Sequence, residues 1–285
     1  MVIAVYLLII LASATQSATT KLFNRNCPHS AIFNAIKSSS ALILFVLSAS
    51  FGFTFHWQTV LFGVLYGCCL CVSMYSGYRA LCCGPMALTS MLASFSVVIP
   101  LIWGVTAGNE TLKTIQYLAL AFLLLAIILL NADKLKAKGS TQINYWLWLM
   151  FVGVTFLCNG ICSILQKQHQ TLYPEQYSKE FMLFAMLFCS IVFAISAFGK
   201  VSLKELKSIK GKRYGVLSGV ANGTANFLTL VLAGFENASV LFPIISAGTI
   251  LASLVCGRLL FGEKLKPNHY IALILGIAAV ILLKL

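Results

Sequence analysis

Charge is scarce in this chain of 285 residues, and negative charge is the scarcest of all. Charged residues make up 9% of the sequence, with 7 Asp and Glu against 20 Lys and Arg. A soluble domain carries charge on about a quarter of its residues, so the composition excludes an ordinary soluble domain. The hydrophobic share of 60% predicts an integral membrane protein instead.

The few acidic residues and histidines also avoid the middle of the apolar runs. They are Glu110, Asp133, Glu175, Glu180, Glu205, Glu236 and Glu263, with His29, His56, His169 and His269. A membrane-embedded enzyme would need His, Asp or Cys ligands clustered at one depth, and the sequence has no such cluster. The motif "CCLC" at residues 68–71 lacks a nearby histidine or carboxylate, so we interpret it as packing. We therefore expect no catalytic residues, no metal site and no cofactor.

Apolar runs long enough to cross about 30 Å of hydrocarbon, which takes about 20 helical residues, recur along the whole chain. They lie at about 2–21, 31–51, 58–81, 84–107, 113–131, 143–165, 180–198, 214–233, 237–260 and 268–284. The runs predict an all-α integral membrane protein with ten transmembrane helices and short connections. None of the connections is long enough to fold as a separate soluble domain.

The sequence contains an internal duplication. Residues 110–120 read "ETLKTIQYLAL" and residues 263–273 read "EKLKPNHYIAL", a separation of 153 positions. The same offset places Gly104 on Gly257. Each "E-x-L-K" turn is interpreted either as a hinge or helix cap that recurs in both halves, or as a polar turn at the membrane interface.

The duplication extends further towards the N-terminus of each half. "GVLYG" at 63–67 matches "GVLSG" at 215–219 with an offset of 152. The sequence therefore predicts a first five-helix repeat at 1–132, a connecting loop at 133–142 and a second five-helix repeat at 143–285. Because five is odd, the second repeat starts on the opposite side of the membrane, and the repeats are inverted. Inverted repeats with a central binding site are typical of secondary transporters.

Two long segments carry a family resemblance. The segment "GPMALTSMLASFSVVIPLIWGVTAGNETLKTIQYLALAFLLLAIILL" at 84–130, with its partner at 236–283, resembles the repeat of the drug/metabolite transporter (DMT) superfamily, EamA branch. The resemblance implies a ten-helix carrier of small metabolites whose cavity is formed chiefly by the first, third and fourth helices of each half. The small multidrug antiporters of that superfamily use an embedded glutamate, which this chain lacks. A neutral, zwitterionic or anionic substrate is therefore favoured.

Polar residues follow one face of the eighth run. Ser218, Asn222, Asn226 and Thr229 recur at steps of four, four and three, which is one side of a helix. A polar group that faces lipid costs energy, so this face should line a cavity or a helix interface.

Small residues form a second pattern in the same helix. Gly215, Gly219 and Gly223 are matched by Gly63, Gly67 and Cys71 in the third run. Such small-residue patterns predict close approach of helix backbones.

The complete set of candidate substrate-binding residues comes from several helices. It is Gln16, Thr20, Tyr75, Tyr78, Ser94, Asn159, Ser163, Asn222, Asn226 and Ser246. For each of them, hydrogen bonding between helices is the alternative to contact with substrate. Lys37 is expected to extend its amine to the membrane interface rather than into the interior.

The sequence thus predicts a secondary transporter for a small polar metabolite, similar to an amino acid or a nucleoside, that works by alternating access. The alternatives are a flippase for a lipid-linked headgroup and, less favoured, a membrane-embedded enzyme. The expected partners are a small-molecule substrate and membrane lipid, without nucleic acid, and the chain is expected to be a monomer or homodimer.

The basic residues predict an orientation in what we expect to be a bacterial cell membrane. Odd-numbered loops and their flanks hold Lys21, Arg25, Lys37, Arg79, Lys134, Lys136, Lys138, Lys200, Lys204, Lys207, Lys210, Lys212, Arg213, Arg258, Lys264 and Lys266, which is 16 of the 20. Even-numbered loops hold Lys113, Lys167 and Lys179. Basic loops stay in the cytoplasm, so both termini are predicted outside it. The family resemblance implies the opposite orientation.

Overall fold

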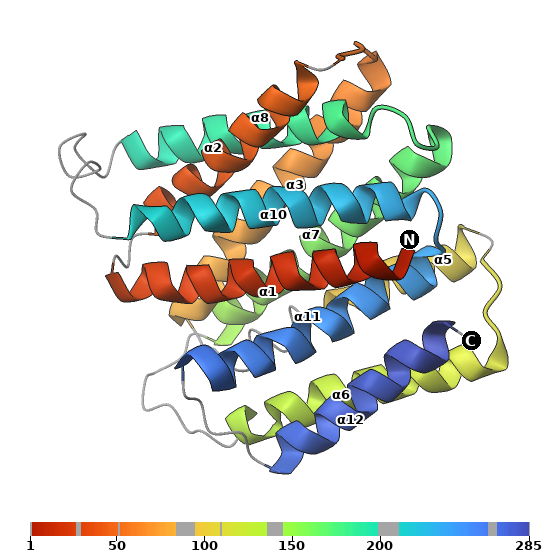
Figure 1. Ribbon diagram of the computed structural model, residues 1–285. Helices are drawn as coiled ribbons and strands as arrows, with labels where there is room; N and C mark the ends of the chain where they lie inside the picture. The colour runs from red at the N-terminus through yellow and green to blue at the C-terminus, as the bar shows by residue number, and fades with distance from the viewer. Residues whose placement is uncertain are drawn as a thin grey trace. The chain divides into compact units, whose positions relative to one another are not determined.

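The computed structural model describes residues 2–26, 30–50, 52–83, 95–108, 110–135, 145–198, 211–261 and 267–284. Every secondary-structure element within these ranges is a helix, which confirms the all-α prediction. The helices are α1 Val2–Asn26, α2 Ser30–Ala49, α3 Trp57–Cys83, α5 Val98–Thr106 with a preceding 3-10 turn η1 Phe95–Val97, α6 Thr114–Leu135, α7 Tyr145–Leu172, α8 Ser178–Phe198, α10 Lys212–Ala233, α11 Ala238–Phe261 and α12 Pro267–Lys284 (Figure 1).

Six stretches of these helices are long and apolar enough to cross a membrane. They are Val2–Thr20, Ala31–Ala49, Trp57–Gly77, Trp146–Leu172, Ser178–Ala197 and Lys212–Ala233. Shorter apolar helical stretches lie at Phe95–Thr106, Thr114–Ala126, Ala238–Ala252 and Ile274–Leu283. The chain therefore fits a membrane protein, while the total of ten spans stays a prediction.

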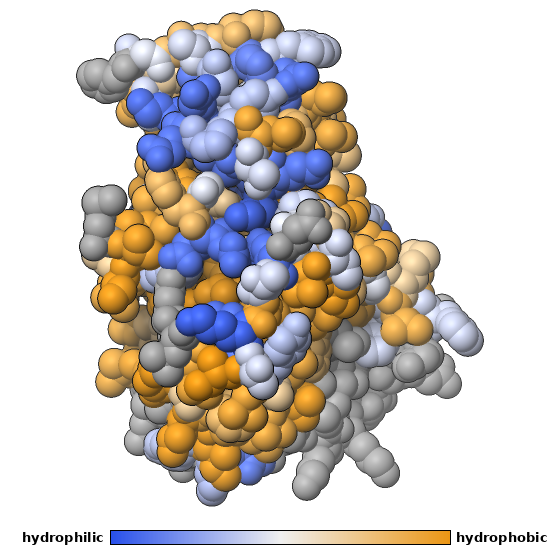
Figure 2. Space-filling model, turned by 90° about the vertical axis from the view of Figure 1, so that its right-hand side faces the viewer, coloured by the Kyte–Doolittle hydropathy of each residue, from blue (hydrophilic) through white to orange (hydrophobic). Residues whose placement is uncertain are grey.

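Large apolar side chains remain on the outside of the helices, as a lipid environment allows. On α1, Ile3, Leu7 and Leu11 recur at four-residue steps and are 74%, 56% and 60% exposed. Figure 2 shows such hydrophobic side chains on one face of the chain, beside patches where hydrophilic residues gather. This apolar exterior fits helices that face lipid.

The chain forms two compact units. The first unit consists of Met1–Cys71 and Leu165–Phe235, and the second consists of Val72–Ile164 and Glu236–Leu285. The boundaries fall inside α3 and α7, so these two helices contribute to both units. Each unit takes segments from both predicted sequence halves, and the division at 1–132, 133–142 and 143–285 stays a prediction about the duplication.

In the first unit, α10 packs against α1 and α2, and its glycines lie against α2. A Cβ atom on Gly219 would collide with the carbonyl oxygen of Lys37 and lie 2.7 Å from the Cβ of Ser40. At Gly223 the corresponding distance to the Cβ of Ala41 is 3.3 Å. The predicted close approach of helix backbones is therefore confirmed for α10 and α2.

The matching glycines of α3 serve the same purpose against α8. A Cβ atom on Gly63 would lie 2.7 Å from the carbonyl oxygen of Phe181, and one on Gly67 would lie 2.8 Å from the carbonyl oxygen of Ala185. Four-residue spacing on both helices keeps the contact on one face of each. Helix α8 also packs against α2 in this unit.

In the second unit, α6 packs along α12, and α11 packs against α5 and α12. The Nε2 of Gln116 at the start of α6 donates to the carbonyl oxygen of Leu283 at the end of α12, at 3.1 Å. The two helices are therefore antiparallel (Figure 1). Their buried contact with α11 is formed by Leu123, Ala247 and Ala279.

A buried glutamate fixes the start of α11. The carboxylate of Glu110 accepts hydrogen bonds from the backbone nitrogens of Ala238 at 2.6 Å and Ser239 at 2.9 Å, and from the Ser239 hydroxyl at 2.6 Å. A negative charge is favourable beside the unpaired N–H groups at a helix N-terminus. The carboxylate lies against Gly104, where a Cβ atom would collide with it. The first "E-x-L-K" turn thus contains a helix cap, and Glu263 of the second turn lies outside the described residues.

Candidate functional site

A buried hydrogen-bond network joins α3, α7 and α10 in the first unit. The Tyr66 hydroxyl donates to the Oδ1 of Asn226 at 2.8 Å. The Nε2 of Gln166 donates to the Tyr66 hydroxyl at 3.4 Å and to the carbonyl oxygen of Asn226 at 3.3 Å. Tyr66 and Gln166 are 2% and 4% exposed. Each of the three helices therefore contributes a polar side chain to one point in the interior of the first unit.

The network continues along α10 to Asn222. The Nδ2 of Asn226 donates to the Oδ1 of Asn222 at 3.2 Å and to its carbonyl oxygen at 2.9 Å. The Oδ1 of Asn226 is therefore engaged by another helix, as the alternative of hydrogen bonding between helices requires, while its Nδ2 is engaged within α10. Asn222 is 5% exposed, and among the residues that the structure describes its Nδ2 has no hydrogen-bond partner. Asn222 therefore keeps a donor that a ligand could use.

Two predicted residues of α1 lie near the start of α10. The hydroxyl groups of Thr20 and Ser218 are 3.5 Å apart, and Thr20 also donates to the carbonyl oxygen of Gln16 at 2.7 Å. Ser218 is fully buried, whereas Thr20 and Gln16 are half-buried. The side chain of Gln16 forms no hydrogen bond to another residue of the described ranges.

The remaining predicted residues belong to the second unit. The Oδ1 of Asn159 accepts a hydrogen bond from the Ser73 hydroxyl at 2.5 Å, and its carbonyl oxygen accepts one from Ser163 at 3.3 Å. Tyr75 is 54% exposed, and its hydroxyl accepts a hydrogen bond from the Nε of Arg79 at 3.1 Å. Asn159 therefore serves contact between α3 and α7.

For the last three candidate residues, Ser246, Tyr78 and Ser94, the described part of the chain shows no side-chain hydrogen bond. Ser246 is half-buried in α11. The side chain of Tyr78 and the whole of Ser94 lie outside the described residues. The predicted residues thus fall into two groups, with Gln16, Thr20, Asn222 and Asn226 in the first unit and Tyr75, Asn159, Ser163 and Ser246 in the second.

Sequence reasoning missed Tyr66. It lies between Gly63 and Gly67 on α3, and its ring packs against Phe181 with a centroid distance of 5.3 Å. A signal was present, because a tyrosine inside an apolar run needs a partner for its hydroxyl. The partner on α10 could not be identified from the sequence, since the two residues are 160 positions apart.

The expectation for Lys37 was wrong. Its side chain is 5% exposed and does not extend to an open surface. The reason is that α2 is covered by both α8 and α10, with Gly219 directly against the Lys37 carbonyl oxygen. Ionisable residues inside membrane helices are commonly functional, so Lys37 joins the candidate residues.

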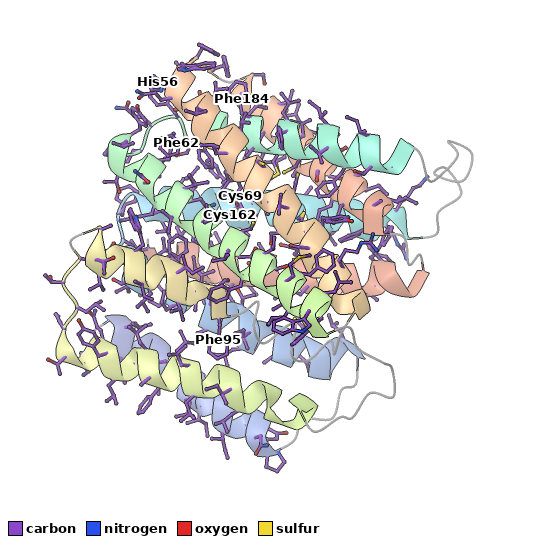
Figure 3. All side chains as sticks on the ribbon, turned by 180° about the vertical axis from the view of Figure 1, so that it is seen from behind. His56, Phe62, Cys69, Phe95, Cys162 and Phe184 are labelled. Atoms are coloured by element: carbon purple, nitrogen blue, oxygen red, sulfur yellow. The ribbon has the colours of Figure 1, made fainter. Side chains whose placement is uncertain are left out.

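A second buried polar chain lies at one end of the first unit. The Thr59 hydroxyl is 3.3 Å from the Nδ1 of His56 and 3.1 Å from the Nε2 of His169. The Nε2 of Gln170 lies 3.1 Å from the Nδ1 of His169 and donates to the Ser178 hydroxyl at 2.9 Å. Figure 3 shows His56 at this end of α3, with Phe62 farther along the helix. The chain of contacts ties the start of α3 and the end of α7 to the start of α8.

This polar chain supports a loop with an unusual backbone. Glu175 and Tyr177 have φ angles of 59° and 54°, in the left-handed region that most side chains avoid. The Tyr177 ring stacks on His56 with a centroid distance of 4.8 Å and an interplanar angle of 14°. The Nε2 of Gln170 also donates to the carbonyl oxygen of Gln176 at 3.4 Å. These contacts hold the loop between α7 and α8 in place.

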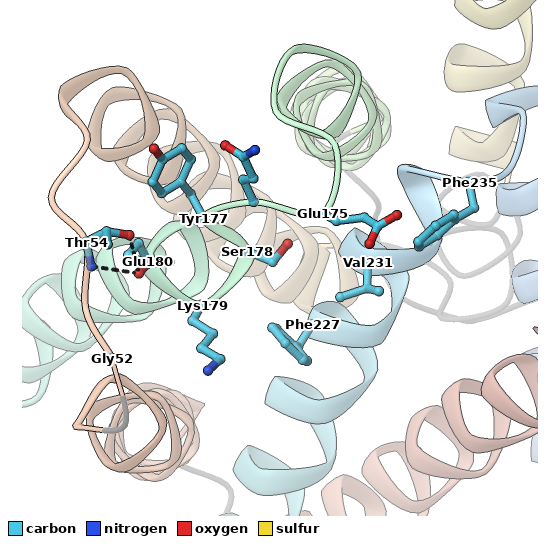
Figure 4. Close-up of a pocket in the computed structure, with 11 residues that line it drawn as sticks. Gly52, Thr54, Glu175, Tyr177, Ser178, Lys179, Glu180, Phe227, Val231 and Phe235 are labelled. Carbon is cyan, nitrogen blue, oxygen red and sulfur yellow. Dashed lines mark hydrogen bonds between the residues drawn. The ribbon is translucent and has the colours of Figure 1, made fainter.

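A pocket of about 550 Å³ lies beneath this loop (Figure 4). It is lined by Gly52, Thr54, Glu175, Gln176, Tyr177, Ser178, Lys179, Glu180, Phe227, Val231 and Phe235, all from the first unit. Its volume is in the range typical of small-molecule sites. In the described residues, no group of three or more His, Cys, Asp or Glu is placed to hold a metal ion.

Comparisons with known proteins address the fold alone. No protein-family model matches the sequence, and no curated protein matches it. Among solved structures, 29 chains match. One of them, named only "Crystal structure of protein", aligns with 99% of this chain and 98% of its own length, with a TM-score of 0.77 and 13% sequence identity. The helical fold is therefore shared with a protein whose name indicates no function.

Proposed function

We propose that this chain is a secondary transporter of the drug/metabolite transporter type, which moves a small polar metabolite across the membrane by alternating access. Its ten spans would form two inverted five-helix repeats. The single observation that carries this proposal is the buried network around Asn222 and Asn226, because a polar centre surrounded by apolar helices suits a substrate site within a membrane.

The packing inside each unit supports the inverted repeat. The sequence duplication makes α6 equivalent to α12, and the order of helices in the two predicted repeats makes α2 equivalent to α8. Each of these pairs is in contact. Both pairs are antiparallel, since Thr54 after α2 donates to Glu180 at the start of α8, and Gln116 of α6 donates to the end of α12. Inverted halves require equivalent helices to run in opposite directions.

The donors of the buried network favour a substrate with hydrogen-bond acceptors. The Nδ2 of Asn222, which has no partner among the described residues, would donate to a carbonyl or carboxylate oxygen. The buried amine of Lys37 in the same unit favours a substrate that carries negative charge, either alone or in a zwitterion. An amino-acid-like or nucleoside-like metabolite has such groups. A flippase for a lipid-linked headgroup is the alternative, and a membrane-embedded enzyme is the less favoured one.

Transport by reconstituted protein tests this proposal. Proteoliposomes would be assayed with a panel of radiolabelled amino acids, nucleosides and their derivatives. Replacing Asn222 with alanine should abolish transport of the accepted substrate, because a donor in a low-dielectric site is lost. The matched control is Gln168→Ala, since Gln168 is an exposed amide on α7. Normal transport by Asn222→Ala at normal expression would make the network a packing feature only.

A further inference from the structure

The pocket beneath the α7–α8 loop has a charge at each of its two sides. Lys179 extends towards Gly52 and Phe227, whereas Glu175 lies on the side of Val231 and Phe235 (Figure 4). A ligand that fills the pocket therefore meets a positive group on one side and a negative group on the other. The face of α10 between them is apolar, with Phe227 and Val231 one helical turn apart.

The third charged residue of the pocket is already engaged. The Oε1 of Glu180 accepts hydrogen bonds from the backbone nitrogen of Thr54 at 3.1 Å and from its hydroxyl at 3.2 Å. Glu180 is 6% exposed and lies in the first turn of α8, where the helix dipole favours a negative charge. Its role is thus structural, and Glu175 and Lys179 remain as the charges that a ligand can meet.

The rim of the pocket is fixed before any ligand arrives. Glu175 and Tyr177 occupy left-handed backbone conformations, which persist only where the surroundings enforce them. The enforcement comes from the stack of Tyr177 on His56 and from the hydrogen bond of Gln170 to the loop. Strained residues of this kind cluster at ligand sites, and a fixed rim lowers the entropy cost of binding.

Exposed aromatic side chains surround the same end of the first unit. Phe53 and Phe55, on the segment between α2 and α3, are 46% and 67% exposed, Trp57 at the start of α3 is 68% exposed, and Phe235 after α10 is 58% exposed. Aromatic residues are enriched where a membrane protein crosses the boundary between hydrocarbon and headgroups. The pocket therefore lies at the level where phospholipid headgroups would be found.

We propose that this pocket binds the headgroup of a zwitterionic phospholipid that carries a primary ammonium group. Lys179 holds the phosphate, Glu175 accepts hydrogen bonds from the ammonium, and the apolar face of α10 receives the beginning of the acyl chains. The lipid is a bound ligand rather than the transported substrate, so the site stands independently of the proposed transport function. A primary ammonium is preferred over a quaternary one because it can donate hydrogen bonds to a carboxylate.

Native mass spectrometry of the purified full-length protein tests the site. Phospholipids with identical acyl chains and ethanolamine, choline or glycerol headgroups would be titrated in detergent. We expect the ethanolamine lipid to bind about threefold to fivefold more tightly than the other two, the range of one exposed charged contact. Equal affinity of the three lipids for the unmodified protein would overturn the proposal.

Two substitutions test which charged residue binds which part of the headgroup. Glu175→Gln should remove the preference for the ethanolamine lipid. Lys179→Gln should lower the affinity for all three lipids by a similar factor. The control Lys212→Gln changes an exposed basic residue at the opposite end of α10 and should change neither result. Because position 175 has a positive φ, Glu175→Asn provides a second variant that tolerates this backbone. Retained preference in both Glu175 variants would overturn the assignment.

A soluble headgroup compound distinguishes binding of a lipid from binding of a free metabolite. Glycerophosphoethanolamine carries the same phosphate and ammonium without acyl chains. We expect it to bind at least tenfold more weakly than the lipid, because the apolar face of α10 and the surrounding aromatic residues are then unused. Equal binding of the two compounds would show that the occupant is a soluble zwitterion and would refute the lipid.

Discussion

The close contact between α10 and α2 predicts a graded response to alanine at three glycines. Gly219 has no space for a methyl group, because a Cβ atom would collide with the Lys37 carbonyl oxygen. Gly223 has marginal space, with 3.3 Å to the Cβ of Ala41, and at Gly153 on α7 no described atom outside the local backbone of the helix lies within 4 Å of that position. The same change, glycine to alanine, is made at each position. Differences in stability among the three variants therefore measure how much space each position has for a methyl group.

The expected change in the free energy of unfolding is the sum of two opposing effects. Alanine in place of a helical glycine stabilises by about 0.5–1 kcal/mol at each site, because it restricts the unfolded chain. Overpacking costs about 1–3 kcal/mol where neighbours cannot yield, and a backbone carbonyl yields less than a side chain. Relative to Gly153→Ala, we therefore expect Gly219→Ala to be less stable by about 1–3 kcal/mol and Gly223→Ala to fall between them.

Thermal unfolding in detergent, followed by size-exclusion chromatography with fluorescence detection, measures this order. Gly153→Ala should unfold at or above the temperature of the unmodified protein, and Gly219→Ala clearly below it. If Gly219→Ala and Gly153→Ala unfold at the same temperature, α10 and α2 do not approach as closely as the structure shows. The reasoning from helix contact would then be refuted.

Three further predictions address single groups. Tyr66→Phe removes the donor to a buried asparagine oxygen and should lower the free energy of unfolding by about 1–3 kcal/mol in chemical denaturation, and an unchanged value would contradict the network. Glu110→Gln should destabilise the chain by about 1 kcal/mol or more through the weakened cap of α11, while Thr111→Ala beside it should have little effect. In a background without the native cysteines, a cysteine at Glu175 should react with an impermeant reagent in intact cells and one at Lys212 should not, and the reverse pattern would favour the family orientation.

The sequence predicted the features that depend on local composition. The all-helical class followed from the apolar runs, and the close contacts of Gly219 and Gly67 followed from small residues at four-residue spacing. These predictions succeeded because a pattern along one helix determines which face can approach a neighbour closely. The neighbour itself, α2 in one case and α8 in the other, was not predictable from the pattern.

Features that depend on distant residues were predicted less well. Asn226 was identified as a polar residue of α10, but the engagement of its amide by Tyr66 required the position of α3. Lys37 was expected at the interface because a lysine near the end of an apolar run usually extends outwards. Two neighbouring helices cover it instead, and no property of residues 30–50 alone reveals that cover.

The duplicated glycine and glutamate now have a physical reason in the first half of the chain. Gly104 leaves space for the Glu110 carboxylate, which caps α11, a helix that belongs to the second sequence half. The equivalent pair is Gly257 and Glu263, and Glu263 lies outside the described residues. If the halves are inverted repeats, the duplication predicts that Glu263 caps the fourth span of the first half in return. Glu263→Gln should then destabilise the chain as much as Glu110→Gln does, and the double variant should lose about the sum of both, since distant sites are additive. A Glu263→Gln variant as stable as the unmodified protein would show that the second turn is only a polar turn at the membrane interface.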